Sequence, residues 1–252
     1  MIDFIHALGF SGTAWLISSL CGILIGMSKA GFAGTGLVAV PIMAVAFGGK
    51  PSTGIVLPML ITADLFAVKY YNRHANWRYV LKITPWAFVG ILIALLVGNY
   101  VSDLWFKWLL SITVLSGVVL MIWQDLKKKV TVPDTKVFAM VLGLAGGFAT
   151  MIGNAAGPIL SLYLLSMRIP KYVFIGTGAW FYLLINLFKV PLHIFSWHTI
   201  THKTIVFDLV MIPPIIIGVF LGIQLVKIIP EKIYRIMVIC IAAISAILLL
   251  IR

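Results

Sequence analysis

Apolar runs separated by short polar or basic stretches divide almost the whole chain. Boundaries set by Pro, Gly and charge clusters predict ten apolar segments, near residues 11–28, 36–48, 54–71, 79–98, 104–123, 137–152, 157–167, 172–195, 204–226 and 233–251. Most approach the twenty or so residues that an α-helix needs to cross a hydrocarbon core of roughly 30 Å. Because backbone polar groups must find internal partners in lipid, the pattern predicts an all-α, polytopic membrane protein.

Two of these segments are short. Segments 36–48 and 157–167 span about twelve residues each, a length closer to that of broken or re-entrant helices than of full crossings. The prediction is therefore eight to ten transmembrane segments. The two short segments either cross fully or dip and return.

The composition excludes a soluble domain. Hydrophobic residues make up 62% of the 252 residues, charged residues only 10%, and the mean hydropathy is +1.12, far from the balanced usage of soluble proteins. A net charge of +12 would suggest nucleic acid as the partner of a soluble protein. In a membrane protein the position of each basic residue matters instead, so we expect membrane lipid, and no nucleic acid, as a partner.

Basic residues concentrate in alternate connections between the predicted segments. If the short segments are counted as crossings, fourteen of the 19 Lys and Arg residues fall on one side: Lys29, Lys69, Arg73, Arg78, Lys82, Lys127, Lys128, Lys129, Lys136, Arg168, Lys171, Lys227, Lys232 and Arg235. The positive-inside rule makes this side cytoplasmic. Both termini, and the connections that hold Lys50, Lys107 and Lys203, are then predicted to lie outside.

The chain contains an internal repeat. Residues 22–41 match residues 143–162 at an offset of 121, DLFAVK at 64–69 lies opposite NLFKVP at 186–191, and residues 90–110 lie opposite 218–238. We therefore predict a first membrane repeat over 1–125, a basic cytoplasmic linker over 126–136 and a second membrane repeat over 137–252. Five segments in each copy make the two copies inverted, an arrangement typical of secondary transporters. A duplicated helical bundle without a transport role stays open as the alternative.

Glycine-interrupted segments at matching places in the two repeats indicate the substrate site. Glycines permit backbone turns, and helices that start there direct free N–H groups at the cavity, which favours an anion. The predicted substrate-binding residues of these segments are Gly34, Thr35, Gly36, Gly153, Asn154 and Gly157. Alternatively, the glycines only allow close helix packing.

Few polar side chains fall within the apolar segments. Asp64 is the only acidic residue well inside one, where a charge facing lipid would cost roughly 2.5 to 3.5 kcal/mol, and we expect it either to gate or couple transport or to form an ion pair with Lys29. Asn186 occupies the equivalent position of the second repeat. Lys29, Asn186 and Lys189 are predicted to contribute to substrate binding, although Lys29 could instead extend to the cytoplasmic interface.

Other chemistry is less favoured by the sequence. The histidines His193, His198 and His202 are expected at the membrane interface rather than in a proton relay or metal site. No nucleotide, phosphate-loop, zinc or nucleophile motif occurs, so we expect no enzyme activity, no catalytic residue, no metal and no cofactor. The alternatives that stay open are a transporter of another solute, such as a metal cation, and an intramembrane enzyme.

Three stretches carry a family resemblance: GFAGTG at 31–36, GNAAGP at 153–158 and GTGAWFYLLINLFKVP at 176–191. With the duplicated layout, they resemble the TauE/SafE family of sulfite exporters, also called the 4-toluene sulfonate uptake permease family. The resemblance implies secondary transport of a small sulfur-containing anion, such as sulfite, sulfoacetate or another organosulfonate, across a prokaryotic inner membrane. Export is the commoner assignment in the family. We also expect transport to be coupled to protons through Asp64, and the protein to be a monomer or a homodimer.

Overall fold

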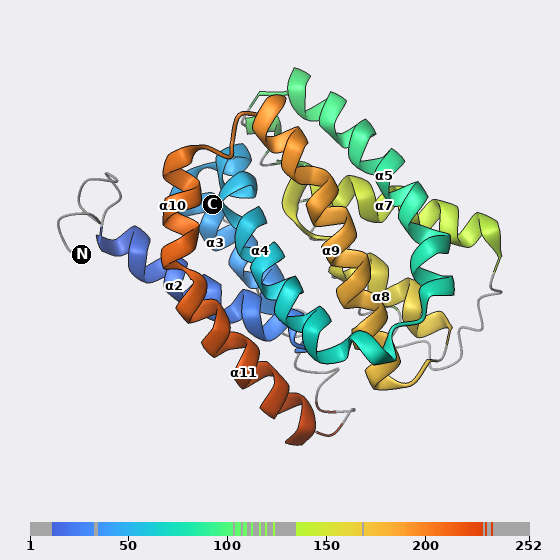
Figure 1. Cartoon of the computed structure of the whole chain (residues 1–252). Helices are drawn as coiled ribbons and strands as arrows, with labels where there is room; N and C mark the ends of the chain where they lie inside the picture. The colour runs from blue at the N-terminus through green and yellow to red at the C-terminus, as the bar shows by residue number, and fades with distance from the viewer. Residues whose placement is uncertain are drawn as a thin grey trace.

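The computed structural model describes residues 12–32, 35–102, 135–167 and 169–228, with scattered positions between 104 and 123 and residues 230 and 233. These residues form helices α2 (Gly12–Lys29), α3 (Thr35–Phe47), α4 (Gly49–Tyr71), α5 (Trp77–Tyr100), α7 (Lys136–Gly153), α8 (Gly157–Ser166), α9 (Lys171–Phe195), α10 (His202–Val210) and α11 (Ile212–Ile228), with a 3₁₀ turn at Asn72–His74 and no strand among them (Figure 1). The predicted segments 104–123 and 233–251, and most of the linker 126–136, lie outside the described residues.

The prediction of an all-α, polytopic membrane protein is confirmed. Of the described helices, α2, α4, α5, α7 and α9 are each long and apolar enough to cross a membrane, and the pair α10 and α11 together is a sixth candidate. The two short segments are also helices, of 13 residues in α3 and 10 residues in α8. Both are therefore shorter than a full crossing requires.

One predicted span is wrong in form. The apolar pattern predicts a single helix over 204–226, but the chain breaks at Met211 and α10 and α11 are bent by 47°. Pro213 and Pro214 follow the break, and prolines have no N–H to continue the hydrogen-bond ladder of α10. The apolar pattern does not predict this break, because the missing backbone N–H of a proline does not change the hydropathy of the segment.

Helices α4 and α9 form the centre of the molecule and run antiparallel, side by side in Figure 1. Near the start of α4, a Cβ at Gly54 would meet Thr199, which follows the end of α9. At the other end of α4, the Tyr71 ring lies 6.4 Å from the ring of Tyr172, at the start of α9. The start of α4 thus lies beside the end of α9, and the end of α4 lies beside the start of α9.

Helix α5 packs closely on α7 because two glycines leave no side chain between the backbones. A Cβ at Gly90 would overlap the carbonyl oxygen of Leu144, and one at Gly147 would overlap that of Ala87. These helices contribute to one buried cluster together with α8 and α9.

Helix α11 packs on α2 in the same way. A Cβ at Gly218 would overlap the carbonyl oxygen of Ile23, and one at Gly26 would overlap that of Ile215. The second buried cluster lies here, among α2, α3, α4, α10 and α11. Each glycine and each carbonyl of this interface is the residue that the sequence repeat aligns with its counterpart between α5 and α7.

A lysine contact also recurs at aligned positions. The Nζ of Lys50, at the start of α4, donates to the carbonyl oxygen of Gly98 over 2.9 Å. The Nζ of Lys171, at the start of α9, donates to the carbonyl oxygen of Val226, the residue aligned with Gly98. Lys50 thus ties the start of α4 to the end of α5, and Lys171 ties the start of α9 to the end of α11.

Candidate functional site

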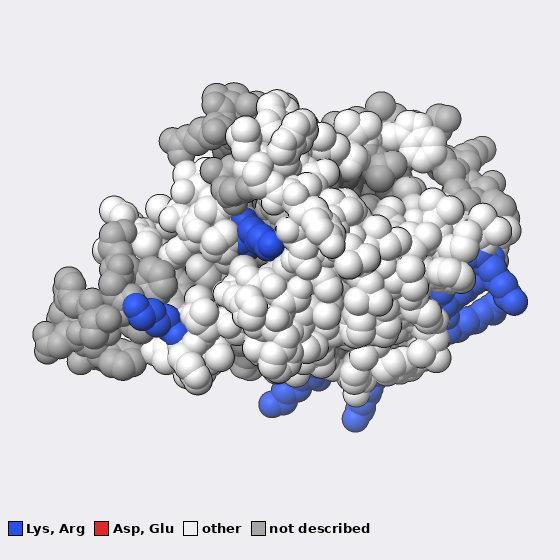
Figure 2. All heavy atoms as spheres, turned by 90° about the horizontal axis from the view of Figure 1, so that it is seen from above, with Lys and Arg blue, Asp and Glu red and all other residues white. Residues whose placement is uncertain are grey.

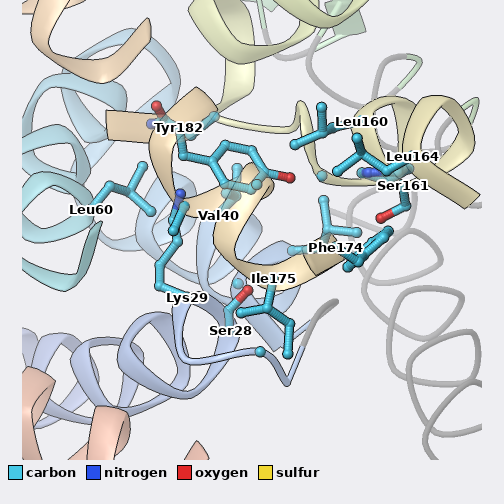
Figure 3. Close-up of a pocket in the computed structure, with 18 of the residues that line it drawn as sticks. Ser28, Lys29, Val40, Leu60, Leu160, Ser161, Leu164, Phe174, Ile175 and Tyr182 are labelled. Carbon is cyan, nitrogen blue, oxygen red and sulfur yellow. The ribbon is translucent and has the colours of Figure 1, made fainter. Parts of the chain in front are cut away.

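A cavity of about 80 Å³ lies where the end of α2, the start of α3, the middle of α4, helix α8 and the first half of α9 meet. Most of its wall is aliphatic or aromatic. The polar side chains that line it come from Ser28, Lys29, Asn154, Ser161 and Tyr182 (Figure 3). We call this cavity the central pocket.

The ammonium group of Lys29 marks one side of the central pocket. Its Nζ lies 2.9 Å from Oδ1 of Asp64 and 3.8 Å from the centroid of the Tyr182 ring, and Figure 3 shows it beside that ring. Only 10% of the side chain is exposed, so the suggestion that Lys29 extends to the interface is wrong. The carboxylate holds the lysine inward, because a buried cation needs a counter-charge.

Asp64 and Asn186 lie at the contact of α4 with α9. The Asn186 amide donates to Oδ2 of Asp64 over 2.6 Å, and both side chains are buried. With Lys29 on its other oxygen, the carboxylate has both a charge partner and a hydrogen-bond donor. The ion pair that the sequence left open as an alternative is thus present.

Lys189 is fully buried and is held by neutral oxygens. Its Nζ donates to the carbonyl oxygen of Thr150 over 3.1 Å, to the hydroxyl of Thr150 over 3.0 Å and to Oδ1 of Asn154 over 2.6 Å. Three acceptors match the three N–H donors of an ammonium group. No carboxylate forms an ion pair with Lys189 among the described residues.

Asn154 connects this lysine to the pocket. It follows the last residue of α7 with φ 53°, the left-handed conformation that Asn adopts more readily than most residues. Its Nδ2 donates to the carbonyl oxygen of Thr53 at the start of α4, while its Oδ1 accepts from Lys189. The end of α7 is therefore fixed to both central helices.

Four polar side chains lie on one face of α9, at positions i, i+4, i+7 and i+11. They are Tyr182, Asn186, Lys189 and His193, and we call them the α9 stripe. His193 has no exposed surface. It is covered by Trp197, whose ring lies 5.1 Å away, and by Thr199, whose hydroxyl is 2.7 Å from Nδ1.

The structure brings most of the predicted site residues together in two layers. Lys29, Gly36, Asn154 and Gly157 line the central pocket, while Asp64, Asn186 and Lys189 lie behind it. Gly153 is buried at the end of α7. The Thr35 hydroxyl donates to the carbonyl oxygens of Leu24 and Phe32 and does not line the pocket, and Gly34 lies outside the described residues.

Two polar side chains of the site were not predicted from the sequence. Thr150, a Lys189 partner, is aligned with Lys29 by the offset of 121, and Tyr182 lies one turn before Asn186; either relation could have identified them. Asp208, at the end of α10, is a second buried carboxylate, 6% exposed, so Asp64 is not alone in being acidic and buried. No three His, Cys, Asp or Glu side chains group as a metal site in the described part of the chain.

Comparison with known proteins agrees with a membrane transporter. No curated protein matches the chain. The family model described as sulfite exporter TauE/SafE matches residues 18–249, which include every described helix from within α2 to α11. The family is one of membrane transporters, which fits a transport role for this chain. Because the match covers nearly all of the 252 residues, the chain belongs to the TauE/SafE sulfite exporter family.

Proposed function

We propose that this protein is a secondary transporter that exports a small sulfur-containing anion across a prokaryotic inner membrane. Sulfite, sulfoacetate and other organosulfonates are the candidate substrates. The observation that supports this best is the Lys29 ammonium group, which contacts the central pocket between a carboxylate and an aromatic ring. An anion that enters the pocket would contact this cation.

The charges around the pocket favour an anion. Lys29 and Lys189 supply two ammonium groups, and Asp64 supplies one carboxylate, which is paired with Lys29. A buried cation that lacks a charge partner is costly, so a bound monoanion would balance the second lysine. A cation would instead increase the positive charge.

The pocket size favours a small substrate. A volume of about 80 Å³ accommodates a few water molecules, at roughly 10 to 15 Å³ each by this measure. Drug-sized ligands need pockets of about 300 Å³ or more. Sulfite or a short organosulfonate suits this space better than a bulky aromatic sulfonate.

Transport proceeds in our proposal by alternating access between two inverted five-segment repeats, over 1–125 and 137–252. The antiparallel contact of α4 with α9 and the aligned glycine contacts support this arrangement. The Asp64 and Asn186 side chains, which the repeat aligns, touch each other. Two equivalent residues of a two-fold arrangement meet only near its axis, so rocking of the halves would occur about this contact.

Coupling to protons fits the Lys29–Asp64 pair. A substrate anion that binds the Lys29 ammonium group competes with the Asp64 carboxylate for it. A carboxylate left buried without its cation is costly, and a proton taken up on its oxygen removes that charge. One anion and one proton would then be carried together, and the ion pair would re-form when both leave.

The test is transport by the purified protein in proteoliposomes. We expect sulfite or an organosulfonate from a panel to exchange across the membrane, with an initial rate that changes under an imposed pH gradient, while protein-free liposomes show no flux. Movement of a cation or a neutral solute, with no flux of any anion of the panel, would contradict the proposal.

The proposed orientation has its own test. The positive-inside rule favours a cytoplasmic position for the end of α4 and the start of α9, and in our proposal both termini and the start of α10 lie outside. In a variant without Cys21 and Cys240, we expect Lys203→Cys to react with an impermeant maleimide added outside whole cells, and Arg73→Cys to react only after lysis. The reverse labelling pattern would rule this orientation out.

A further inference from the structure

Two side-chain nitrogen atoms are buried without a hydrogen-bond partner at the end of α9, far along the helix from the central pocket. His193 Nε2 and Trp197 Nε1 have no hydrogen-bond partner among the described residues, and the two side chains are 0% and 6% exposed. A buried donor left unpaired costs about 1–3 kcal/mol. Native proteins leave few such groups, so two neighbouring ones suggest a ligand that is absent from this conformation.

The tautomer of His193 determines whether its free nitrogen is a donor. The Thr199 hydroxyl lies 2.7 Å from Nδ1 and can donate to it, which leaves the proton on Nε2. Trp197 Nε1 is always a donor. In this arrangement both unpaired groups donate, and both suit an oxyanion.

Two cations flank these donors. Lys189 lies one turn before His193 on the α9 stripe, and Lys50 Nζ lies 4.8 Å from the centroid of the Trp197 ring. Its hydrogen bond to Gly98 holds Lys50 at this end of the molecule. The face seen from above in Figure 2 shows Lys and Arg atoms and no Asp or Glu atom among the described residues.

We propose that Lys189, His193, Trp197 and Lys50 form a second anion-binding site, which the substrate occupies between the central pocket and the outer face. The inference rests on the proposed function, since it assumes an anion that crosses the protein. In the present conformation this outer site is closed, and its donors gain their partner when the halves rock open at this end.

The repeat explains why the site lies here. Thr150, which holds Lys189, is the residue aligned with Lys29. Exchange of the conformations of the two halves would place Thr150 and Lys189 in the surroundings that Lys29 has now, at the edge of a cavity. Lys189 would then meet the anion at the outer opening, as Lys29 meets it at the inner one.

The experiment measures the KM for sulfite separately from each face, in right-side-out and inside-out membrane vesicles. His193→Leu removes the donor, Trp197→Phe removes only the N–H, and His193→Gln retains a donor near the place of Nε2. Trp108→Phe, at a side chain that is 52% exposed, is the matched control.

We expect His193→Leu to raise the outer-face KM about tenfold, the effect of one charge-assisted hydrogen bond. Trp197→Phe raises it severalfold, and the inner-face KM stays near the wild-type value. His193→Gln and Trp108→Phe stay near wild type from both faces.

Several outcomes would overturn the outer site. Equal changes from both faces indicate a general structural role, and unchanged outer-face values for both His193→Leu and Trp197→Phe show that no anion binds there. Loss of transport in His193→Gln would indicate proton transfer instead of anion binding. If the wild type transports sulfite in these cases, only the outer site fails; if it transports no anion, the proposed function fails with it.

Discussion

Replacement of Lys29 by methionine is expected to reduce sulfite transport at low concentration by about a hundredfold. The methionine keeps the apolar stem that lines the central pocket but removes the ammonium group that, in our proposal, binds the substrate. Loss of one close charge partner in a buried site costs roughly 2–5 kcal/mol, and each 1.4 kcal/mol is a factor of about ten in affinity. Initial rates in proteoliposomes over a range of sulfite concentrations measure the effect.

The same substitution leaves Asp64 buried without its cation, which destabilises a protein by about 3–5 kcal/mol. A second variant, Lys29→Met with Asp64→Asn, removes both charges of the pair. We expect this double variant to recover most of the lost thermal stability while transport stays low. Lys69→Met, at an exposed position of α4, is the control for loss of a lysine. A double variant that transports sulfite at the wild-type rate would show that Lys29 serves the fold alone.

The helices were predictable because the apolar runs of a membrane protein are bounded by charged residues, which are costly to place in the hydrocarbon core of the membrane. Helix α9 is predicted over 172–195 and is observed over Lys171–Phe195. Helix α4 begins five residues earlier than the predicted 54–71, because Lys50 and Pro51 look like a boundary in the sequence pattern. Proline is well tolerated in the first turn of a helix, and Lys50 directs its ammonium group to Gly98.

The polar residues were less predictable because their partners come from distant segments. Lys29 and Asp64 both stand out in the sequence, but the choice between an ion pair and an interfacial lysine depends on where the end of α2 meets α4. His193 precedes a loop, which suggests the interface, yet Trp197 and Thr199 cover it. Tyr182 and Thr150 are ordinary membrane-helix residues, and only the helical spacing or the repeat distinguishes them.

The glycines show how an alternative from the sequence can hold at some positions and not at others. Close helix packing explains Gly26 and Gly147, whose Cβ positions are occupied by backbone atoms of the facing helix. It does not explain Gly157, which lines the central pocket and where a Cβ would meet only the Tyr182 hydroxyl, at 3.7 Å. Close helix packing and lining of the central pocket thus fall to different glycines of one pattern.

Substitution of Gly147 by alanine is expected to lower the melting temperature of the purified protein, by up to about 8 °C. The new methyl group would overlap the Ala87 carbonyl, a backbone atom that cannot rotate away, so α5 and α7 must separate. Overpacking of this kind costs about 1–3 kcal/mol, and the higher helix propensity of alanine offsets about 1 kcal/mol of this cost. Each remaining kcal/mol corresponds to roughly 2–4 °C in a protein of this size. Thermal unfolding in detergent measures the change.

The adjacent Gly146→Ala is the matched control, because it lies on the same helix and its Cβ would meet only the Ile159 side chain, at 3.5 Å. Alanine favours a helix over glycine by about 1 kcal/mol at both positions, so only the contact with α5 makes their effects differ in sign. Gly26→Ala should destabilise as Gly147→Ala does, since its methyl group would overlap the Ile215 carbonyl. A large loss of melting temperature for Gly147→Ala with none for Gly26→Ala would mean that the two aligned helix interfaces do not contribute equally to stability. The two halves would then not rock as equivalent units.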